Sequence, residues 1–159
     1  MAMHTWFECK IRYEKVMENG MQKKVTEPYL VDALSFTEAE ARIIEEMTPF
    51  ISGEFTVSDI KRAHYSELFP SDEESADRWF KCKLIFITLD EKSGAEKKTS
   101  TQVLVQAADL RDAVKKLDEG MKGTMADYQI GMVSETPLMD VYPYSAEPND
   151  KPEFDPSKA

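Results

Sequence analysis

The chain has 159 residues, a length that suits one compact domain or two small ones and allows a buried core. Hydrophobic residues make up 42% and charged residues 31% of it, the composition of an ordinary globular protein. The formal net charge of -10 argues against a uniformly basic nucleic-acid-binding protein, although a local basic patch is compatible with that total.

A stretch near the start of the chain occurs twice. Residues 6–11 read Trp-Phe-Glu-Cys-Lys-Ile and residues 79–84 read Trp-Phe-Lys-Cys-Lys-Leu, and together they hold both tryptophans and both cysteines. The similarity continues well beyond the two hexapeptides. We therefore interpret the chain as an internal duplication, with repeat 1 at residues 5–70, an acidic connector at 71–78 and repeat 2 at 79–144.

The first repeat begins with two predicted strands. Residues 5–14 alternate between apolar and polar side chains, and this period of two predicts a half-buried strand. Its inward positions are Phe7, Cys9, Ile11 and Tyr13. Asn19-Gly20 supplies the chemistry of a tight turn, and a second strand is predicted from about Met21 to Val31. Pro28 should lie at a bulge or at a sheet edge, because it cannot donate a backbone hydrogen bond.

A helix and two shorter strands complete the repeat. Ser35 stands three residues before Glu38, which is a capping-box spacing, and the predicted helix runs to about Met47. Its expected buried stripe is Phe36, Ala39, Ile43 and Met47. Residues 55–57 and 65–69 then indicate two short strands. The acidic connector has no apolar periodicity, so we expect a solvated linker.

The second repeat follows the same order. Asp109 takes the cap position of Ser35, and apolar residues keep every inward position of the first strand and of the helix: Phe80, Cys82, Leu84, Phe86, Leu110, Ala113, Leu117 and Met121. We predict one α+β domain over residues 1–144, built as two strand-strand-helix-strand-strand units with mainly antiparallel sheets, related by a pseudo-two-fold axis. Residues 145–159 are rich in Pro and acidic residues and predict a flexible tail.

Signatures of catalysis are missing. The chain has no glycine-rich phosphate loop, nucleophile elbow, histidine-containing metal motif or Cys-x-x-Cys, so we expect a non-catalytic protein without a cofactor or metal. Cys9 and Cys82 lie on the predicted apolar face, where a thiol is a small hydrophobe, and His4 and His64 are expected to be solvated. With no export segment and no run of ~20 apolar residues, we expect a cytoplasmic protein and no membrane association.

The face of each hairpin opposite the core carries the candidate functional residues. Residues 6–31 hold five basic against four acidic residues, and residues 79–105 hold five against three, so the hairpins are relatively basic within an acidic chain. An exposed aromatic ring beside lysines is typical of surfaces that bind single-stranded nucleic acid, because bases stack on the ring and ammonium groups meet phosphates. The candidates are Trp6, Lys10, Arg12, Lys23, Lys24, Trp79, Lys81, Lys83, Lys97 and Lys98.

Two other interpretations of these residues stay open. Each tryptophan can close the edge of a core, and lysines on strands commonly protect sheet edges against aggregation. Ile85 and Ile87 share the face of Trp79 and Lys83, which suits a protein interface better than a track of phosphates. The alternative hypothesis is therefore a protein-interaction or structural module, with a protein partner at the acidic surface or the tail. The sequence leaves monomer and homo-oligomer undecided.

The chain also resembles a family of uncharacterised proteins met mainly in gut Bacteroidetes and their phages or mobile elements. The residues that carry the resemblance are 6–10, 23–33 and 86–92, and the similarity covers residues 5–144. The resemblance implies no established activity. A mobile-element setting would favour a role accessory to DNA metabolism.

Overall fold

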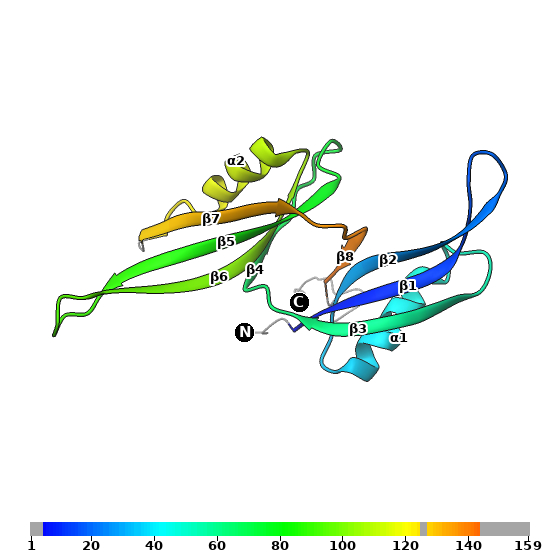
Figure 1. Ribbon diagram of the computed structural model, residues 1–159, viewed down its shortest axis with the longest axis horizontal. Helices are drawn as coiled ribbons and strands as arrows, with labels where there is room; N and C mark the ends of the chain where they lie inside the picture. The colour runs from blue at the N-terminus through cyan, green and yellow to red at the C-terminus, as the bar shows by residue number, and fades with distance from the viewer. Residues whose placement is uncertain (1–4, 125–126, 144–159) are drawn as a thin grey trace, which may run out of the picture. The chain divides into compact units, whose positions relative to one another are not determined.

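The computed structural model describes residues 5–124 and 127–143, and the predictions for His4, residue 144 and the tail at 145–159 lie outside them. The elements follow the order β1 (Trp6–Val16), β2 (Gln22–Asp32), α1 (Phe36–Met47), β3 (Phe55–Ala63), β4 (Glu67–Phe69), β5 (Arg78–Leu89), β6 (Glu96–Ala107), α2 (Leu110–Gly120), β7 (Asp127–Glu135) and β8 (Asp140–Tyr142), as Figure 1 shows. The predicted α+β class with mainly antiparallel sheets is confirmed, and two similar sheet units fit the predicted duplication.

Each sheet takes three strands from one repeat and its fourth from the other. The strand orders are β3-β1-β2-β8 and β4-β6-β5-β7. Within each sheet the three strands of one repeat are antiparallel, whereas β8 pairs in parallel with Tyr29–Val31 of β2 and β4 pairs in parallel with Val103–Val105 of β6. The repeats thus exchange their last strands, an arrangement that is not predicted from the sequence.

This exchange of strands determines which residues form each of the two compact units of the chain. Of the described residues, the first unit contains 5–63 and 140–143, and the second unit contains 64–124 and 127–139. The units therefore differ from the sequence repeats by one short strand each. The predicted domain bounds, which follow the repeats, stay a prediction.

A bulge at the same place in both sheets supports the duplication. The pairing of β1 with β3 shifts between Lys10 and Ile11, and the pairing of β5 with β7 shifts between Lys83 and Leu84. These positions are equivalent in the two repeats. In the second sheet the extra residue is Gly131, where an added Cβ would lie 2.9 Å from Cδ1 of Ile85. A glycine here lets the isoleucine side chain lie directly over the backbone of β7.

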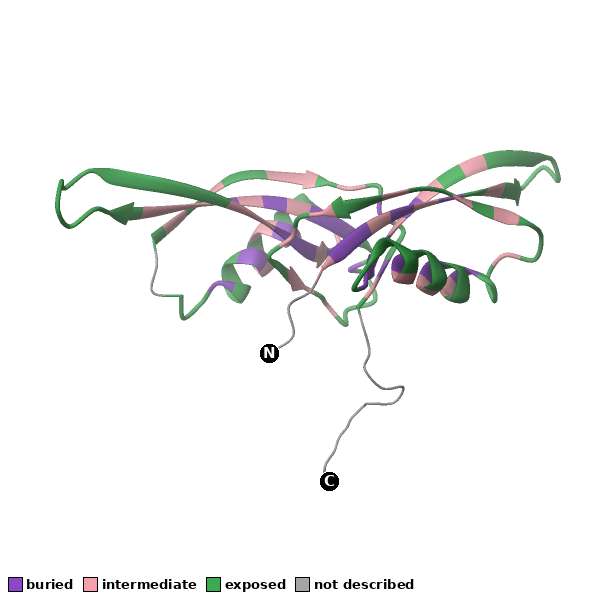
Figure 2. Ribbon diagram, turned by 90° about the horizontal axis from the view of Figure 1, so that it is seen from below, coloured by how far each residue is buried: buried purple, intermediate pink, exposed green. Residues whose placement is uncertain are grey.

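The helices begin where the capping residues predict. The Ser35 side chain accepts a hydrogen bond from the Glu38 backbone N–H at 3.1 Å, and Asp109 accepts one from the Asp112 N–H at 2.8 Å. Each bond satisfies a backbone donor that the first helical turn leaves free. Both helices therefore start at equivalent positions, and each lies on one face of its own sheet (Figure 2).

Each unit has its own core between helix and sheet. The first contains Phe7, Cys9, Ile11, Val31, Ala33, Ala39, Ile43 and Met47, and the second contains Phe80, Cys82, Leu84, Val103, Val105, Ala107, Ala113, Leu117 and Met121. The predicted inward positions are confirmed except at the start of each helix. Phe36 is 48% exposed and Leu110 is 52% exposed. The Phe36 ring still meets the core residue Phe7 edge-on, with the ring centroids 4.9 Å apart.

One predicted strand is longer in the structure than expected, and one predicted turn is confirmed. The strand expected at residues 55–57 continues to Ala63, because β3 pairs with β1 as far as Trp6. Gly20 closes the first hairpin with a positive φ of 83°, as the predicted turn requires. Within the described ranges, none of the helices is long and apolar enough to cross a membrane.

Candidate functional site

Both tryptophans are buried, which agrees with the interpretation that each closes the edge of a core and does not agree with an exposed ring. Trp6 is 3% exposed and Trp79 is 6% exposed. Neither indole face is available to stack on a base. The side chains next to them on the same sheet faces are buried too, since Leu30 and Leu104 are fully inaccessible. Each sheet is therefore buried on both faces at the end where the exchanged strand is added, and the tryptophans belong to that end.

The pairing register divides the predicted basic residues between two faces. Lys23 pairs with Lys15, and Lys97 pairs with Thr88, so both lie on the helix-covered faces of their sheets. The opposite faces, which carry no helix, hold Lys10, Arg12 and Lys24 in the first unit and Lys81, Lys83 and Lys98 in the second. The predicted set of ten residues thus does not form one surface.

On the helix-free face of the first sheet, basic side chains stand opposite acidic ones. Lys10 pairs across the strands with Asp59, Lys24 with Glu14, and Glu8 with Lys61. Opposite charges at paired positions stabilise a sheet and cancel its local potential. Arg12 is the exception, because it pairs with threonines on both sides, Thr26 and Thr56. This face is therefore a charge-compensated, solvated surface.

The helix-free face of the second sheet has a different character. Lys81 pairs with Leu104 and Ser134, and Lys83 pairs with Gln102 and Met132, so neither has a carboxylate opposite it. Beyond them lie Ile85 and Ile87, both half-buried, with Lys98 paired to Ile87. We call this surface the lysine–isoleucine face and define it as Lys81, Lys83, Ile85, Ile87, Lys98 and Met132.

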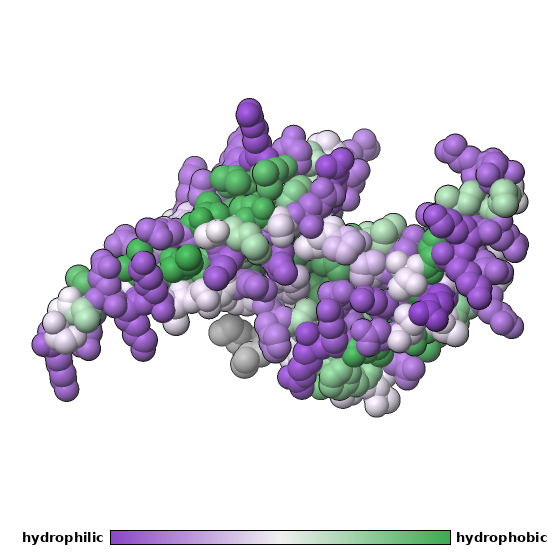
Figure 3. Space-filling view, in the orientation of Figure 1, coloured by the Kyte–Doolittle hydropathy of each residue, from purple (hydrophilic) through white to green (hydrophobic). Residues whose placement is uncertain are grey.

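Apolar atoms on this face remain accessible. Met132 is 39% exposed, and Leu89 at the end of the same row is 68% exposed. Figure 3 shows hydrophobic residues along β5 flanked by hydrophilic ones. In the described part of the chain, the three lysines of the face form no ion pair. The face therefore combines an aliphatic row with lysines that form no ion pair, and Asp127 and Glu96 lie at its far end, opposite Ile87 and Leu89.

The apolar and cationic character of this face comes from residues that differ between the two repeats. Glu8, Arg12 and Glu14 of the first repeat are replaced at the equivalent positions by Lys81, Ile85 and Ile87. The inward positions keep their apolar character in both copies, so the difference is confined to the helix-free face. Ile85 and Ile87 were expected on this face from their alternation with the core positions, but Met132 was not, because its position depends on the bulge at Gly131.

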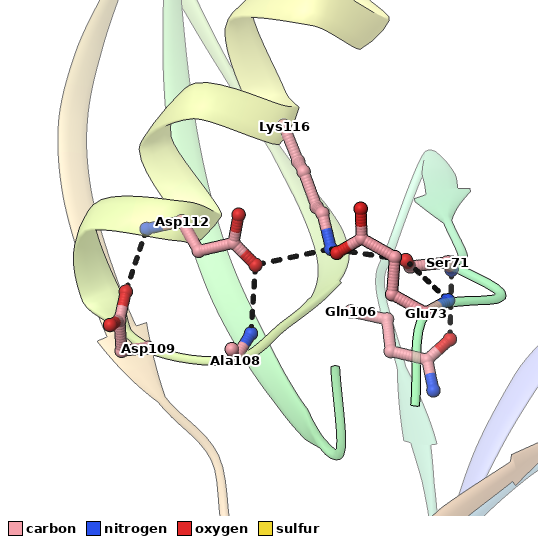
Figure 4. Close-up of polar contacts among 7 residues, drawn as sticks. All are labelled: Ser71, Glu73, Gln106, Ala108, Asp109, Asp112 and Lys116. Carbon is pink, nitrogen blue, oxygen red and sulfur yellow. Dashed lines mark hydrogen bonds and ion pairs between the residues drawn. The ribbon is translucent and has the colours of Figure 1, made fainter. Parts of the chain in front are cut away.

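A polar network joins α2 to the connector after β4 (Figure 4). The Lys116 Nζ lies 2.9 Å from Oε1 of Glu73, 3.1 Å from Oδ2 of Asp112 and 3.0 Å from the Ser71 hydroxyl. The backbone N–H of Ser71 donates to Oε1 of Gln106 at 2.9 Å. Ala76 in the same segment is 3% exposed. The connector is thus attached to the second unit at Ser71, Glu73 and Ala76, while residues 72–75, 77 and 78 are exposed, as expected of a solvated linker.

The network changes the proton affinity of its charged groups. Hydrogen bonds from the Ala108 backbone N–H and from Lys116 hold the pKa of Asp112 below its usual value. For Lys116, desolvation acts to lower the pKa, but hydrogen bonds to Glu73 and Asp112 outweigh it and leave the pKa raised. Both shifts favour the charged forms, so the network holds together as ions at neutral pH.

A hollow of about 340 Å³ opens beside this network. Its lining is Phe69, Pro70, Ser71, Asp72, Glu73, Lys116, Glu119 and Gly120. Three carboxylates line it against one lysine, and that lysine is already held by Glu73 and Asp112. Lys116, Glu73 and Ser71 at this hollow therefore bind one another, and we assign them the role of holding the connector.

The remaining titratable candidates lie in unreactive settings. Burial raises the pKa of the Cys9 thiol to about 12 and that of Cys82 to about 11, which disfavours the nucleophilic thiolate. His64 is exposed, as expected. Among residues 5–124 and 127–143, no group of three His, Cys, Asp or Glu side chains is placed to hold a metal ion.

Comparisons with known proteins identify a family without a known activity. The family described as a domain of unknown function (DUF4494) matches residues 5–144, and the chain belongs to it. No curated protein and no solved structure matches the chain.

Proposed function

We propose that this protein is a non-catalytic binding module that recognises a segment of another protein through the lysine–isoleucine face. The observation that supports this most directly is the register of the second sheet, which sets Lys81 and Lys83 opposite neutral residues beside Ile85 and Ile87. Uncompensated cations next to accessible aliphatic groups, on a sheet face without a helix, form a surface on which an apolar and anionic segment gains both kinds of contact.

The chemistry of the face defines the partner. Half-buried isoleucines and Met132 offer an apolar strip that has no aromatic side chain, so the partner contributes aliphatic groups. The three lysines require carboxylates at the border of that strip, where opposite charges speed association and fix the register. We therefore expect an extended segment in which aliphatic residues are interspersed with Asp or Glu.

Selection from a displayed random-peptide library tests this proposal. Wild-type protein should enrich peptides that combine aliphatic residues with Asp or Glu. The same library should lose this enrichment on the Lys83→Glu variant and keep it on Lys10→Glu, the equivalent lysine of the first repeat. Absence of enrichment, or enrichment that survives Lys83→Glu, would show that this face is not a protein-binding site.

A second candidate is single-stranded nucleic acid binding, with a role accessory to DNA metabolism. It is supported by the three lysines on one face, which can meet phosphates, although the buried tryptophans leave the bases without a stacking platform. Binding of a labelled oligothymidylate should then weaken steeply with salt and weaken further in Lys83→Glu, but Ile87→Ser should not change it. Peptide binding responds to both substitutions, so Ile87→Ser separates the two candidates.

The cellular setting belongs to the same proposal. A cytoplasmic location is supported by two buried free thiols, since such cysteines persist in reducing compartments. The raised pKa of both thiols also supports a non-catalytic role, because it makes covalent catalysis by cysteine unfavourable. A phage or mobile-element origin in Bacteroidetes remains part of the proposal and would be tested by the genomic neighbourhood of related genes.

A further inference from the structure

The edge of β2 accepts a strand that is distant in sequence. Strand β8 pairs with Tyr29–Val31 through three residues, Asp140, Val141 and Tyr142. The Tyr142 ring stacks on Tyr29 with their centroids 6.2 Å apart. Beyond the strand, the Arg42 guanidinium donates to the Pro143 carbonyl oxygen at 3.2 Å. The attached strand is short, but strand pairing, the tyrosine stack and the Arg42 hydrogen bond all hold the same segment.

The second unit repeats this mode of attachment with equivalent residues. Strand β4 pairs in parallel with Val103–Val105 of β6. The inserted segments read Glu-Leu-Phe-Pro at residues 67–70 and Asp-Val-Tyr-Pro at residues 140–143. Both therefore present an acidic, an aliphatic and an aromatic residue followed by proline. The edges of β2 and β6 thus bind segments of similar sequence, each of which comes from the other repeat.

The segment that connects β7 to β8 is short and restricted. Only residues 136–139 join β7 to β8, and Thr136 is fixed by its backbone N–H and its hydroxyl, which both donate to the Trp79 carbonyl oxygen at 2.9 Å. Residue 137 is proline, which limits the backbone further. Short, restricted hinges of this kind favour strand exchange between copies.

We propose that β8 exchanges between copies of this chain, so that the edge of β2 at Tyr29–Val31 in one copy takes β8 of a second copy and the two form a reciprocal dimer. The contacts are the same in monomer and dimer, because the exchanged segment is identical. Release requires opening of three residue pairs, the Tyr29–Tyr142 stack and the Arg42–Pro143 hydrogen bond, which is far less than global unfolding. The dimer fraction therefore rises with protein concentration. This inference is independent of the lysine–isoleucine face.

Disulfide trapping between differently tagged chains tests the exchange. One chain carries Tyr29→Cys and the other Asp140→Cys, which are paired positions of β2 and β8. Mixed as folded chains, and in parallel refolded together, they should form a disulfide-linked heterodimer that shifts the mass from 18.2 kDa to twice that value. Both chains also carry Cys9→Ala, because Cys9 pairs with position 29 across β1 and β2 and would compete for the introduced thiol. The raised pKa of the Cys82 thiol keeps it protonated near pH 8, so the introduced thiols react first.

Two controls make the outcome decisive. The pair Lys24→Cys with Asp140→Cys places the first thiol on β2 outside the paired segment, and it should give no heterodimer. A single chain with both Tyr29→Cys and Asp140→Cys shows that the bond can form at this site. If that chain closes its disulfide internally while the mixed chains never cross-link, and light scattering finds wild-type monomer at every concentration, exchange between copies is ruled out.

Discussion

Arg42 and Lys116 occupy equivalent positions, seven residues after the cap of their helices, and each binds the segment that follows an exchanged strand. Arg42 donates to the Pro143 carbonyl oxygen after β8, and Lys116 to Glu73 and Ser71 after β4. The duplication has therefore kept a basic residue at this position, and its partner is Pro143 of repeat 2 in the first unit and the connector in the second unit. The two side chains fix the strand exchange that defines the units.

Removing the Lys116 ammonium group should destabilise the second unit. Lys116→Met keeps the aliphatic stem but leaves Glu73 and Asp112 without their cation, in a place where the lysine side chain is only 15% exposed. We expect a loss of about 1 kcal/mol in the free energy of unfolding, measured with urea. Lys115→Met, at an exposed neighbouring position, is the control. Equal stability of the two variants would show that the network contributes nothing.

The same network predicts a dependence of stability on pH. The pKa of Asp112 is lower in the folded chain than in the unfolded chain, where it is about 3.9. Its contribution is therefore present above that unfolded value and is lost as the pH falls through the folded pKa. Asp112→Asn should be less stable than wild type at pH 7, and the difference should shrink in acid.

Urea unfolding of both proteins at several pH values provides the measurement. Asp127→Asn, an exposed carboxylate of β7, serves as the control and should leave the acid limb of the wild-type curve unchanged. A stability difference between Asp112→Asn and wild type that stays constant down to pH 2 would contradict this account.

Gly120 makes room for an aromatic ring of the exchanged strand. A Cβ added at Gly120 would lie 2.8 Å from Cε1 of Phe69, and β4 fixes Phe69 opposite Val105. Gly120→Ala should therefore destabilise the protein by about 1 kcal/mol, despite the better helix propensity of alanine. In the Phe69→Ala background the same change should be neutral or stabilising. Additive effects in this double-mutant cycle would exclude the contact as the cause.

The burial of the tryptophans predicts a structural role. Trp79→Ala should cost about 3 kcal/mol in the free energy of unfolding, as expected for a large core side chain. Leu89→Ala, on the same strand but 68% exposed, should change stability by less than about 0.5 kcal/mol. Native tryptophan fluorescence should resist quenching by iodide. Strong quenching in the folded protein would mean that the rings are exposed.

Local structure followed from the sequence because its causes are local. The period-two pattern at Phe7, Cys9 and Ile11 gave the strand and its inward face, and Ser35 and Asp109 gave the helix starts. The pairing of β4 with β6 could not be predicted, because a strand as short as Glu67–Phe69 can pair with any free edge of a sheet. The period-two pattern shows which side chains share a face of the sheet, but not whether the second face is also buried, so the exposure of the tryptophans could not be predicted.

A signal for the second buried face was present in the sequence. Tyr29-Leu30-Val31 and Val103-Leu104-Val105 are continuous apolar runs, which are typical of strands buried on both faces and of parallel pairing. They mark the segments that receive β8 and β4. The charge pairs of Lys10 and Lys24 likewise required the strand register, because Asp59 is distant in sequence.

The most direct test of the proposed function is mapping of amide shifts by NMR while a peptide enriched on the wild-type protein is added. We predict that the perturbed amides cluster along β5 from Lys81 to Leu89, together with Lys98 and Met132. Perturbations centred on Arg12 and Lys24, or on the hollow beside Lys116, would contradict the claim that the lysine–isoleucine face is the binding surface.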